Sequence, residues 1–184
     1  MRKLGVVLIA AGCSLAFAAR AQDTNALKTE IGIFESQTGV VIIRGFDQVG
    51  SVPTSDAIIS VRCKESTSAA TGRKYYGIAI VMEGNQWRRV AIVDYDELDR
   101  LLDSMDYLGK MTYNVTALPG FEATFTTKSG LELSSHGNKQ QGGIRTFLEY
   151  DDSPRISLAS DRWIQLAKLI EQAKATLDAL RTPK

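Results

Sequence analysis

The sequence predicts an α+β protein made of two tandem units, each with four antiparallel strands followed by a helix. Three observations support this fold class. Eight short segments alternate apolar and polar residues, two longer segments repeat apolar residues every three or four positions, and four strands precede a helix twice. Alternation is typical of a strand with one buried face, and the longer spacing is typical of a helix with one apolar stripe.

The first unit is expected over residues 40–110, after an N-terminal segment at 22–39. Its strands are expected at 39–46, 57–64, 74–82 and 87–93. Gly84-Asn85 separates the last two strands and favours a hairpin turn. The helix is expected at 94–108, and its apolar stripe consists of Leu98, Leu101, Leu102, Met105 and Leu108.

The second unit is expected over residues 111–184. Its strands are expected at 121–127, 131–135, 143–150 and 155–158. Ser129-Gly130 and the loop from Gly137 to Gly143 are the expected connections, and we place His136 in the same polar loop. The helix runs from Ser160 to about Leu180, with a stripe of Trp163, Leu166, Ala167, Ile170, Ala173, Leu177 and Leu180. At an offset of 65 residues the two units align Val93 with Leu158, Leu98 with Trp163, Leu101 with Leu166 and Met105 with Ile170. This alignment predicts a structural repeat in which each helix packs its stripe on a sheet.

The first 21 residues have the layout of a secretory signal peptide. Arg2 and Lys3 precede an apolar run at residues 4–19, and small residues follow it. We expect cleavage after Ala21, in Ala19-Arg20-Ala21, with cleavage after Ala18 as the alternative. The prediction is therefore an exported protein, periplasmic or secreted, without a transmembrane segment in the mature chain.

Cys13 offers a second interpretation of the N-terminus, as the lipid-modified cysteine of a lipoprotein. Ala10 stands three residues before it, where a larger aliphatic residue is expected, and the apolar run continues through Phe17. Ordinary cleavage is therefore preferred.

The mature chain is slightly acidic and has one cysteine. Removing residues 1–21 leaves 19 Lys and Arg residues against 21 Asp and Glu residues, a formal net charge of −2. This balance argues against a basic nucleic-acid binder. Cys63 alternates with Ile59 and Val61, so we expect a buried free thiol rather than a disulfide or a nucleophile.

The C-terminal strand and helix resemble a known family. The strand-to-helix ending of that family matches this chain at Ile156, Ser157, Leu158, Trp163, Gln165, Leu166 and Ile170. This ending is similar to that of the general transcriptional coactivators that bind single-stranded DNA, and the two-unit organisation is similar to the Whirly proteins. The resemblance covers about 25 residues and implies the fold more than the activity.

Two departures from these families bear on function. Ala159 stands where the coactivator helix has a capping residue, which leaves Ser160 to cap a helix that starts one residue later. The Whirly motif Lys-Gly-Asn-Lys-Ala-Leu has its nearest match at residues 137–139, which we interpret as loop. With the signal peptide and the acidic balance, these departures argue against a role in transcription.

Two groups of charged residues are candidate sites. The acidic run from Asp94 to Asp106 lacks the ligand spacing of a calcium loop, and Asp94 with Glu97 is better explained as a capping box. Cations and aromatic rings that suit a polyanion gather around two strands, at Arg73, Lys74, Tyr75, Tyr76, Trp87, Arg88 and Arg89. In a Gly84-Asn85 hairpin, Arg73 and Lys74 lie at the end opposite Trp87.

Three hypotheses for function follow. The first, which we prefer, is an exported non-catalytic interaction or structural module without a cofactor. The second is an extracellular or periplasmic nucleic-acid or polyanion binder that uses the sheet and the Arg88/Arg89 region. The third is a hydrolase that acts through two carboxylates, although no catalytic or metal-binding motif is present. Because the second helix is longer than one strand can cover, we also expect homo-oligomerisation through helices.

Overall fold

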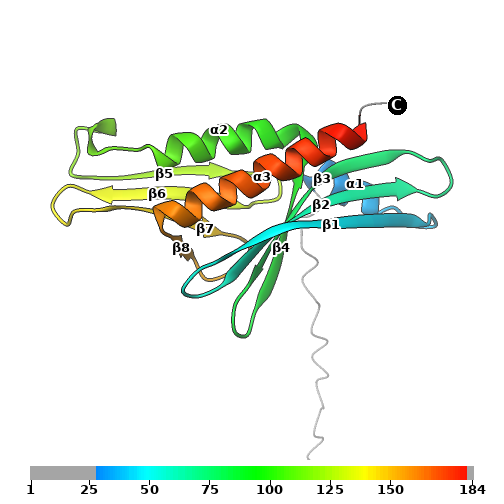
Figure 1. The fold of residues 1–184 in the computed structure, drawn as a ribbon, viewed down its shortest axis with the longest axis horizontal. Coiled ribbons are helices and arrows are strands. Elements are labelled where there is room, and N and C mark those ends of the chain that lie inside the picture. The colour runs from blue at the N-terminus through cyan, green and yellow to red at the C-terminus, as the bar shows by residue number, and fades with distance from the viewer. Residues whose placement is uncertain (1–27, 182–184) are drawn as a thin grey trace, which may run out of the picture.

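The structure, a computed structural model, describes residues 28–181 (Figure 1). Helix α1 spans Glu30–Glu35, and the first four strands are β1 (Ile42–Pro53), β2 (Ile58–Ser68), β3 (Lys74–Glu83) and β4 (Arg88–Asp94). A 3₁₀ turn at Tyr95–Glu97 leads into α2 (Leu98–Gly109). A second 3₁₀ turn at Tyr113–Val115 precedes β5 (Gly120–Thr126), β6 (Glu132–Asn138), β7 (Ile144–Glu149), β8 (Ile156–Leu158) and α3 (Ser160–Arg181).

The eight strands form two antiparallel sheets in sequence order, β1-β2-β3-β4 and β5-β6-β7-β8. This arrangement confirms the predicted α+β fold of two tandem units. The turns at Gly84-Asn85 and Ser129-Gly130 are hairpin connections, since the Gly84 N–H donates to the Trp87 carbonyl and the Thr127 N–H to the Leu131 carbonyl. The register places apolar residues of neighbouring strands opposite each other on the face that packs against the long helices. Val61 lies opposite Ile80 in the first sheet, and Leu133 lies opposite Leu148 in the second.

Each long helix lies mainly on the sheet of the other unit. Helix α2 follows the first sheet but contacts β5 and β6, whereas α3 starts beside β8 and then crosses β1 and β2 (Figure 1). The two helices also pack against each other. The two units therefore share one hydrophobic core rather than forming separate ones.

The stripe residues aligned between the two helices are all buried, from Leu98 and Trp163 to Met105 and Ile170. Burial of each such large side chain stabilises the fold by about 1.5–3 kcal/mol. Leu177 is also buried, so α3 uses most of its length within its own chain. Leu180 differs from the prediction: it is more than half exposed, so the buried stripe of α3 ends at Leu177.

Cys63 is buried as predicted. Its side chain faces α3, where Sγ lies 3.5 Å from the Ala173 carbonyl oxygen and donates to it. Burial raises the pKa of this thiol, and the nearby charge of Asp47 raises it further. The thiol is therefore a packing group of the sheet–helix interface.

Helix α1 was not predicted from the sequence. Thr29 caps it by accepting from the Gly32 N–H at 2.9 Å, and its buried residues are Ile31 and Phe34. The helix packs on the face of the first sheet opposite α3, because Gly77 in β3 leaves room for Ile31. Residues 28–35 of the N-terminal segment thus belong to the fold of the first unit.

Two further expectations are corrected. Helix α3 includes Ser160 as its first residue, and the Trp163 N–H donates to the Ala159 carbonyl, so Ala159 is the capping position and Ser160 is not. Strand β6 continues to Asn138, so His136, Gly137 and Asn138 lie on a strand rather than in a loop.

Candidate functional site

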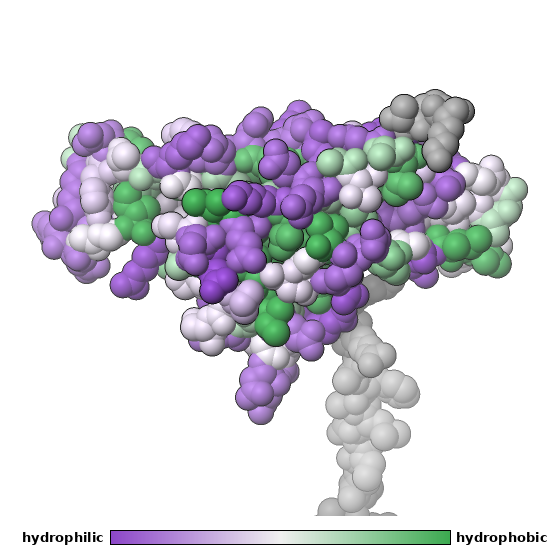
Figure 2. Space-filling view, viewed as in Figure 1, coloured by the Kyte–Doolittle hydropathy of each residue, from purple (hydrophilic) through white to green (hydrophobic). Residues whose placement is uncertain are grey.

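A groove between α2 and α3 has a volume of about 470 Å³. Its apolar lining includes Leu102, Met105, Trp163, Ile164 and Ala167. Figure 2 shows the helix layer, where apolar surface interrupts the charged side chains. Ile164, at the edge of the groove, is 55% exposed, so its apolar side chain is available to a partner.

The floor of the groove is fixed by Trp163. Its indole Nε1 donates to the Met105 carbonyl at 2.9 Å, which ties the start of α3 to the end of α2. Gly109 allows this approach, since a β-carbon there would lie 2.9 Å from the indole nitrogen. At the other end of the helix pair, Lys174 lies 3.4 Å from Asp99. The two helices are therefore antiparallel, with a polar contact at each end.

Charged side chains form the rim. Asp103 lies on α2 and Lys168 on α3, and neither takes part in an ion pair within the described residues 28–181. Because the helices are antiparallel with Met105 beside Trp163 and Asp99 beside Lys174, Asp103 and Lys168 stand at about the same level of the groove.

The predicted polyanion residues lie at two separate ends of the β3–β4 hairpin. Trp87, Arg88 and Arg89 are at the turn end, and Arg73 and Lys74 are at the other end, as the hairpin interpretation requires. Several of these cations already have acidic partners: Lys74 is 3.0 Å from Glu65, and Arg89 is 3.6 Å from the carboxylate of Asp151. The surface therefore carries mixed charges rather than a continuous basic patch.

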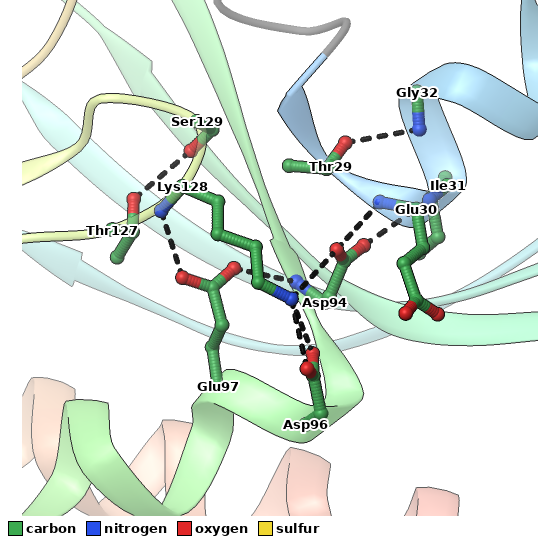
Figure 3. Close-up of polar contacts among 10 residues, drawn as sticks. All are labelled: Thr29, Glu30, Ile31, Gly32, Asp94, Asp96, Glu97, Thr127, Lys128 and Ser129. Carbon is green, nitrogen blue, oxygen red and sulfur yellow. Dashed lines mark hydrogen bonds and ion pairs between the residues drawn. The ribbon is translucent and has the colours of Figure 1, made fainter.

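Asp94 and Glu97 lie at the junction of the two units (Figure 3). They form the predicted capping box, and the Asp94 carboxylate also accepts the N–H groups of Glu30 and Ile31 at 2.6 and 3.2 Å. Glu97 accepts the N–H of Lys128, in the β5–β6 turn, at 2.7 Å. Within residues 28–181, no three side chains of the types that bind metals come together.

Lys128 completes this junction, because its ammonium lies 3.5 Å from Asp94 and 2.8 Å from Asp96. Burial by itself lowers the pKa of Lys128, but the pairing with Asp96 and Asp94 raises it overall. Burial raises the pKa of Glu97, and the bonds to backbone N–H groups offset this only in part. The ammonium of Lys128 is thus shared by the carboxylates of Asp94 and Asp96.

His136 lies on the outer face of the second sheet, in a cluster that the sequence did not reveal. Its Nε2 lies 3.2 Å from Glu122, 3.1 Å from the Ser134 hydroxyl and 3.5 Å from Arg155, and its ring meets Phe147 edge-on. A Ser-His-acid triad uses both ring nitrogens, one toward the serine and one toward the acid. Here one nitrogen faces all three groups, so the cluster has the geometry of an ion-pair network and not of a triad.

The remaining predicted site residues, Ala19 and Ala21 at the expected cleavage site, lie outside the described residues, as does Cys13. No helix within residues 28–181 is long and apolar enough to span a bilayer. Comparison with known proteins gave no matching family model, no matching curated protein and no matching solved structure.

Proposed function

We propose that the protein is an exported, non-catalytic interaction module, and that its partner at the α2–α3 groove is a second copy of the same chain. The observation that carries this proposal is the apolar groove floored by Trp163, with the exposed Ile164 at its edge. In a two-fold dimer both copies use the same surface patch. The exposed apolar side chain of each copy could then pack against the groove of the other copy.

The rim charges favour one of the two face-to-face arrangements. A two-fold axis across the groove would stack α2 on α2 of the partner, whereas an axis along the groove stacks α2 on α3. The second arrangement keeps each residue at the same level along the groove, so Asp103 of each copy faces Lys168 of the other. Opposite charges at the rim fix register and disfavour wrong partners.

The expected export supports a structural or interaction role outside the cytoplasm. The signal peptide, the mature charge of −2 and the mixed surface charge favour a protein partner over a polyanion. The sequence predicted an oligomer because α3 is longer than one strand can cover. In the structure the apolar stripe of α3 is buried within its own chain as far as Leu177, so the length of the helix is no longer evidence for a partner. The evidence for a partner is instead the apolar α2–α3 groove with the exposed Ile164 at its edge.

A matched pair of substitutions tests the proposal. Ile164→Glu places a charge in the interface, and Ile33→Glu places the same charge at a residue on α1 with nearly equal exposure, 54% against 55%. Sedimentation velocity over a concentration series should show a dimer for the wild type and for Ile33→Glu, and a monomer for Ile164→Glu. A wild type that stays monomeric at high concentration, or equal behaviour of the two variants, would contradict the proposal.

A further inference from the structure

A second cavity, of about 270 Å³, lies where the start of β3, the Tyr95–Glu97 turn, the first turn of α1 and the end of α3 meet. Its walls carry three tyrosines and three cations. The residues that matter most are Arg73, Tyr75, Tyr95 and Arg181. They come from three distant parts of the sequence, so no local pattern brings them together.

Both arginines are held by ring stacking. The Arg73 guanidinium lies over the Tyr75 ring at 4.9 Å, and the Arg181 guanidinium lies over the Tyr95 ring at 3.6 Å. Within residues 28–181, neither guanidinium takes part in an ion pair. Stacking on a ring fixes the plane of a guanidinium and leaves its N–H donors, which point outward in that plane, available to an acceptor.

Three carboxylates, those of Glu30, Asp94 and Asp96, also line the cavity, and two of them share one ammonium group. Asp94 accepts two backbone N–H groups and lies near Lys128, and Lys128 also contacts both oxygens of Asp96 (Figure 3). The third cation, Lys74, is paired with Glu65. The lining as a whole is balanced, with three cations and three carboxylates. Of the lining charges that have no ion-pair partner within residues 28–181, two are the cations Arg73 and Arg181 and one is the carboxylate of Glu30.

We propose that this cavity binds a small organic anion, whose carboxylate or phosphate group accepts hydrogen bonds from Arg73 and Arg181. The fork of a guanidinium matches both groups, and a stacked guanidinium loses less side-chain entropy on binding. The volume suits a small molecule and is too small for a nucleic-acid strand. The Trp87-Arg88-Arg89 end of the hairpin takes no part. The site is independent of the proposed dimer, since it lies outside the α2–α3 groove.

Nuclear magnetic resonance of the arginine Nε–Hε groups tests the proposal, with inorganic phosphate, succinate and a thymidine oligonucleotide as separate probes at low salt. Phosphate or succinate should shift the Arg73 and Arg181 signals in a saturable way. The probe that binds with the higher affinity identifies the preferred anionic group, phosphate or carboxylate. Arg73→Gln and Arg181→Gln should each weaken binding about tenfold or more, the loss expected for a charge-assisted hydrogen bond. Arg88→Gln, which removes the same charge at the other end of the hairpin, should leave binding unchanged.

Three results would overturn this proposal. One is the lack of a saturable shift at millimolar phosphate and succinate. Another is an equal loss of binding in Arg88→Gln, which would indicate diffuse attraction. The last is tight binding of the oligonucleotide that depends on Arg88 as well as Arg73, which would indicate a polymer surface. Circular dichroism of the three variants checks that each substitution leaves the fold intact.

Discussion

The ammonium of Lys128, in the turn between β5 and β6, lies 3.5 Å from the carboxylate of Asp94, at the end of β4. This contact joins the two sheets at a point where the Asp94 carboxylate also holds the first turn of α1. Three segments from different parts of the chain therefore depend on one carboxylate that is 2% exposed.

Asp94→Asn should destabilise the protein by about 2–3 kcal/mol, because it leaves Lys128 and the α1 N–H groups with a weaker partner in a buried place. The matched control is Asp106→Asn, which breaks an exposed pair with Lys110 at 2.6 Å and should cost no more than about 0.5 kcal/mol. Urea unfolding followed by circular dichroism measures both. Equal losses in the two variants would remove Asp94 from its proposed structural role.

Glu35 should make stability depend on pH in the acidic range. Burial raises its pKa, but the hydrogen bonds from Lys64, Ser66 and Arg44 and the charge of Lys64 lower it overall, below its ordinary value of 4.5. A carboxyl group with a lowered folded-state pKa contributes stability above its unfolded pKa and loses it as pH falls through the folded pKa. Glu35→Gln should therefore cost about 1–3 kcal/mol at neutral pH and little below the lowered pKa.

Glu83→Gln is the control for this prediction, because Glu83 pairs with Arg88 only at 4.0 Å and both side chains are exposed. It should lower stability little at any pH. Urea unfolding of the three proteins from neutral to acidic pH makes the comparison. A cost of Glu35→Gln that persists unchanged at the acidic end would show that the charge of Glu35 is not its cause.

Gly77→Ala should displace α1. A β-carbon at residue 77 would lie 2.3 Å from the Val93 carbonyl oxygen and 2.7 Å from Ile31 Cδ1, so we expect a loss of about 1–3 kcal/mol. Gly45→Ala adds the same methyl group on β1, 3.9 Å from Glu65 Cβ, and should change stability by no more than about 0.5 kcal/mol. Thermal unfolding of the two variants gives the answer, and similar midpoints would contradict the packing of α1 against β3.

Single-stranded DNA should bind weakly, in spite of the resemblance to families that bind it. The cations at the β3–β4 hairpin are split between its two ends, and Lys74 and Arg89 have acidic partners. Fluorescence anisotropy with a labelled oligonucleotide across a salt series checks this. Tight binding that falls steeply with salt, and that Arg88→Ala with Arg89→Ala weakens, would favour the polyanion hypothesis.

The repeated pattern of strands and helices could be predicted because it depends on local periodicity. Leu98 and Trp163 occupy equivalent stripe positions, and both are buried. Helix α1 was missed because it has only six residues, and a distant carboxylate, Asp94, completes its N-terminus. Such a short helix depends on tertiary contacts rather than on its own propensity.

His136 was assigned to a loop because Ser, Gly and Asn surround it. The register pairs Gly137 with both Phe121 and Ile144, and the Phe121 ring fills the space above Gly137, so β6 extends through these polar residues. The α2–α3 groove could not be predicted either. It depends on how helices from the two units pack together, which periodicity within one helix does not specify.

Charge reversal at the groove tests the central claim most directly. Asp103→Lys and Lys168→Asp should each convert the dimer to a monomer in sedimentation equilibrium, because each places like charges across the two-fold interface. The double variant, Asp103→Lys with Lys168→Asp, should restore the dimer, since the opposite charges again face each other between copies. A double variant that stays monomeric, or single variants that remain dimeric, would contradict a dimer with α2 of one copy on α3 of the other.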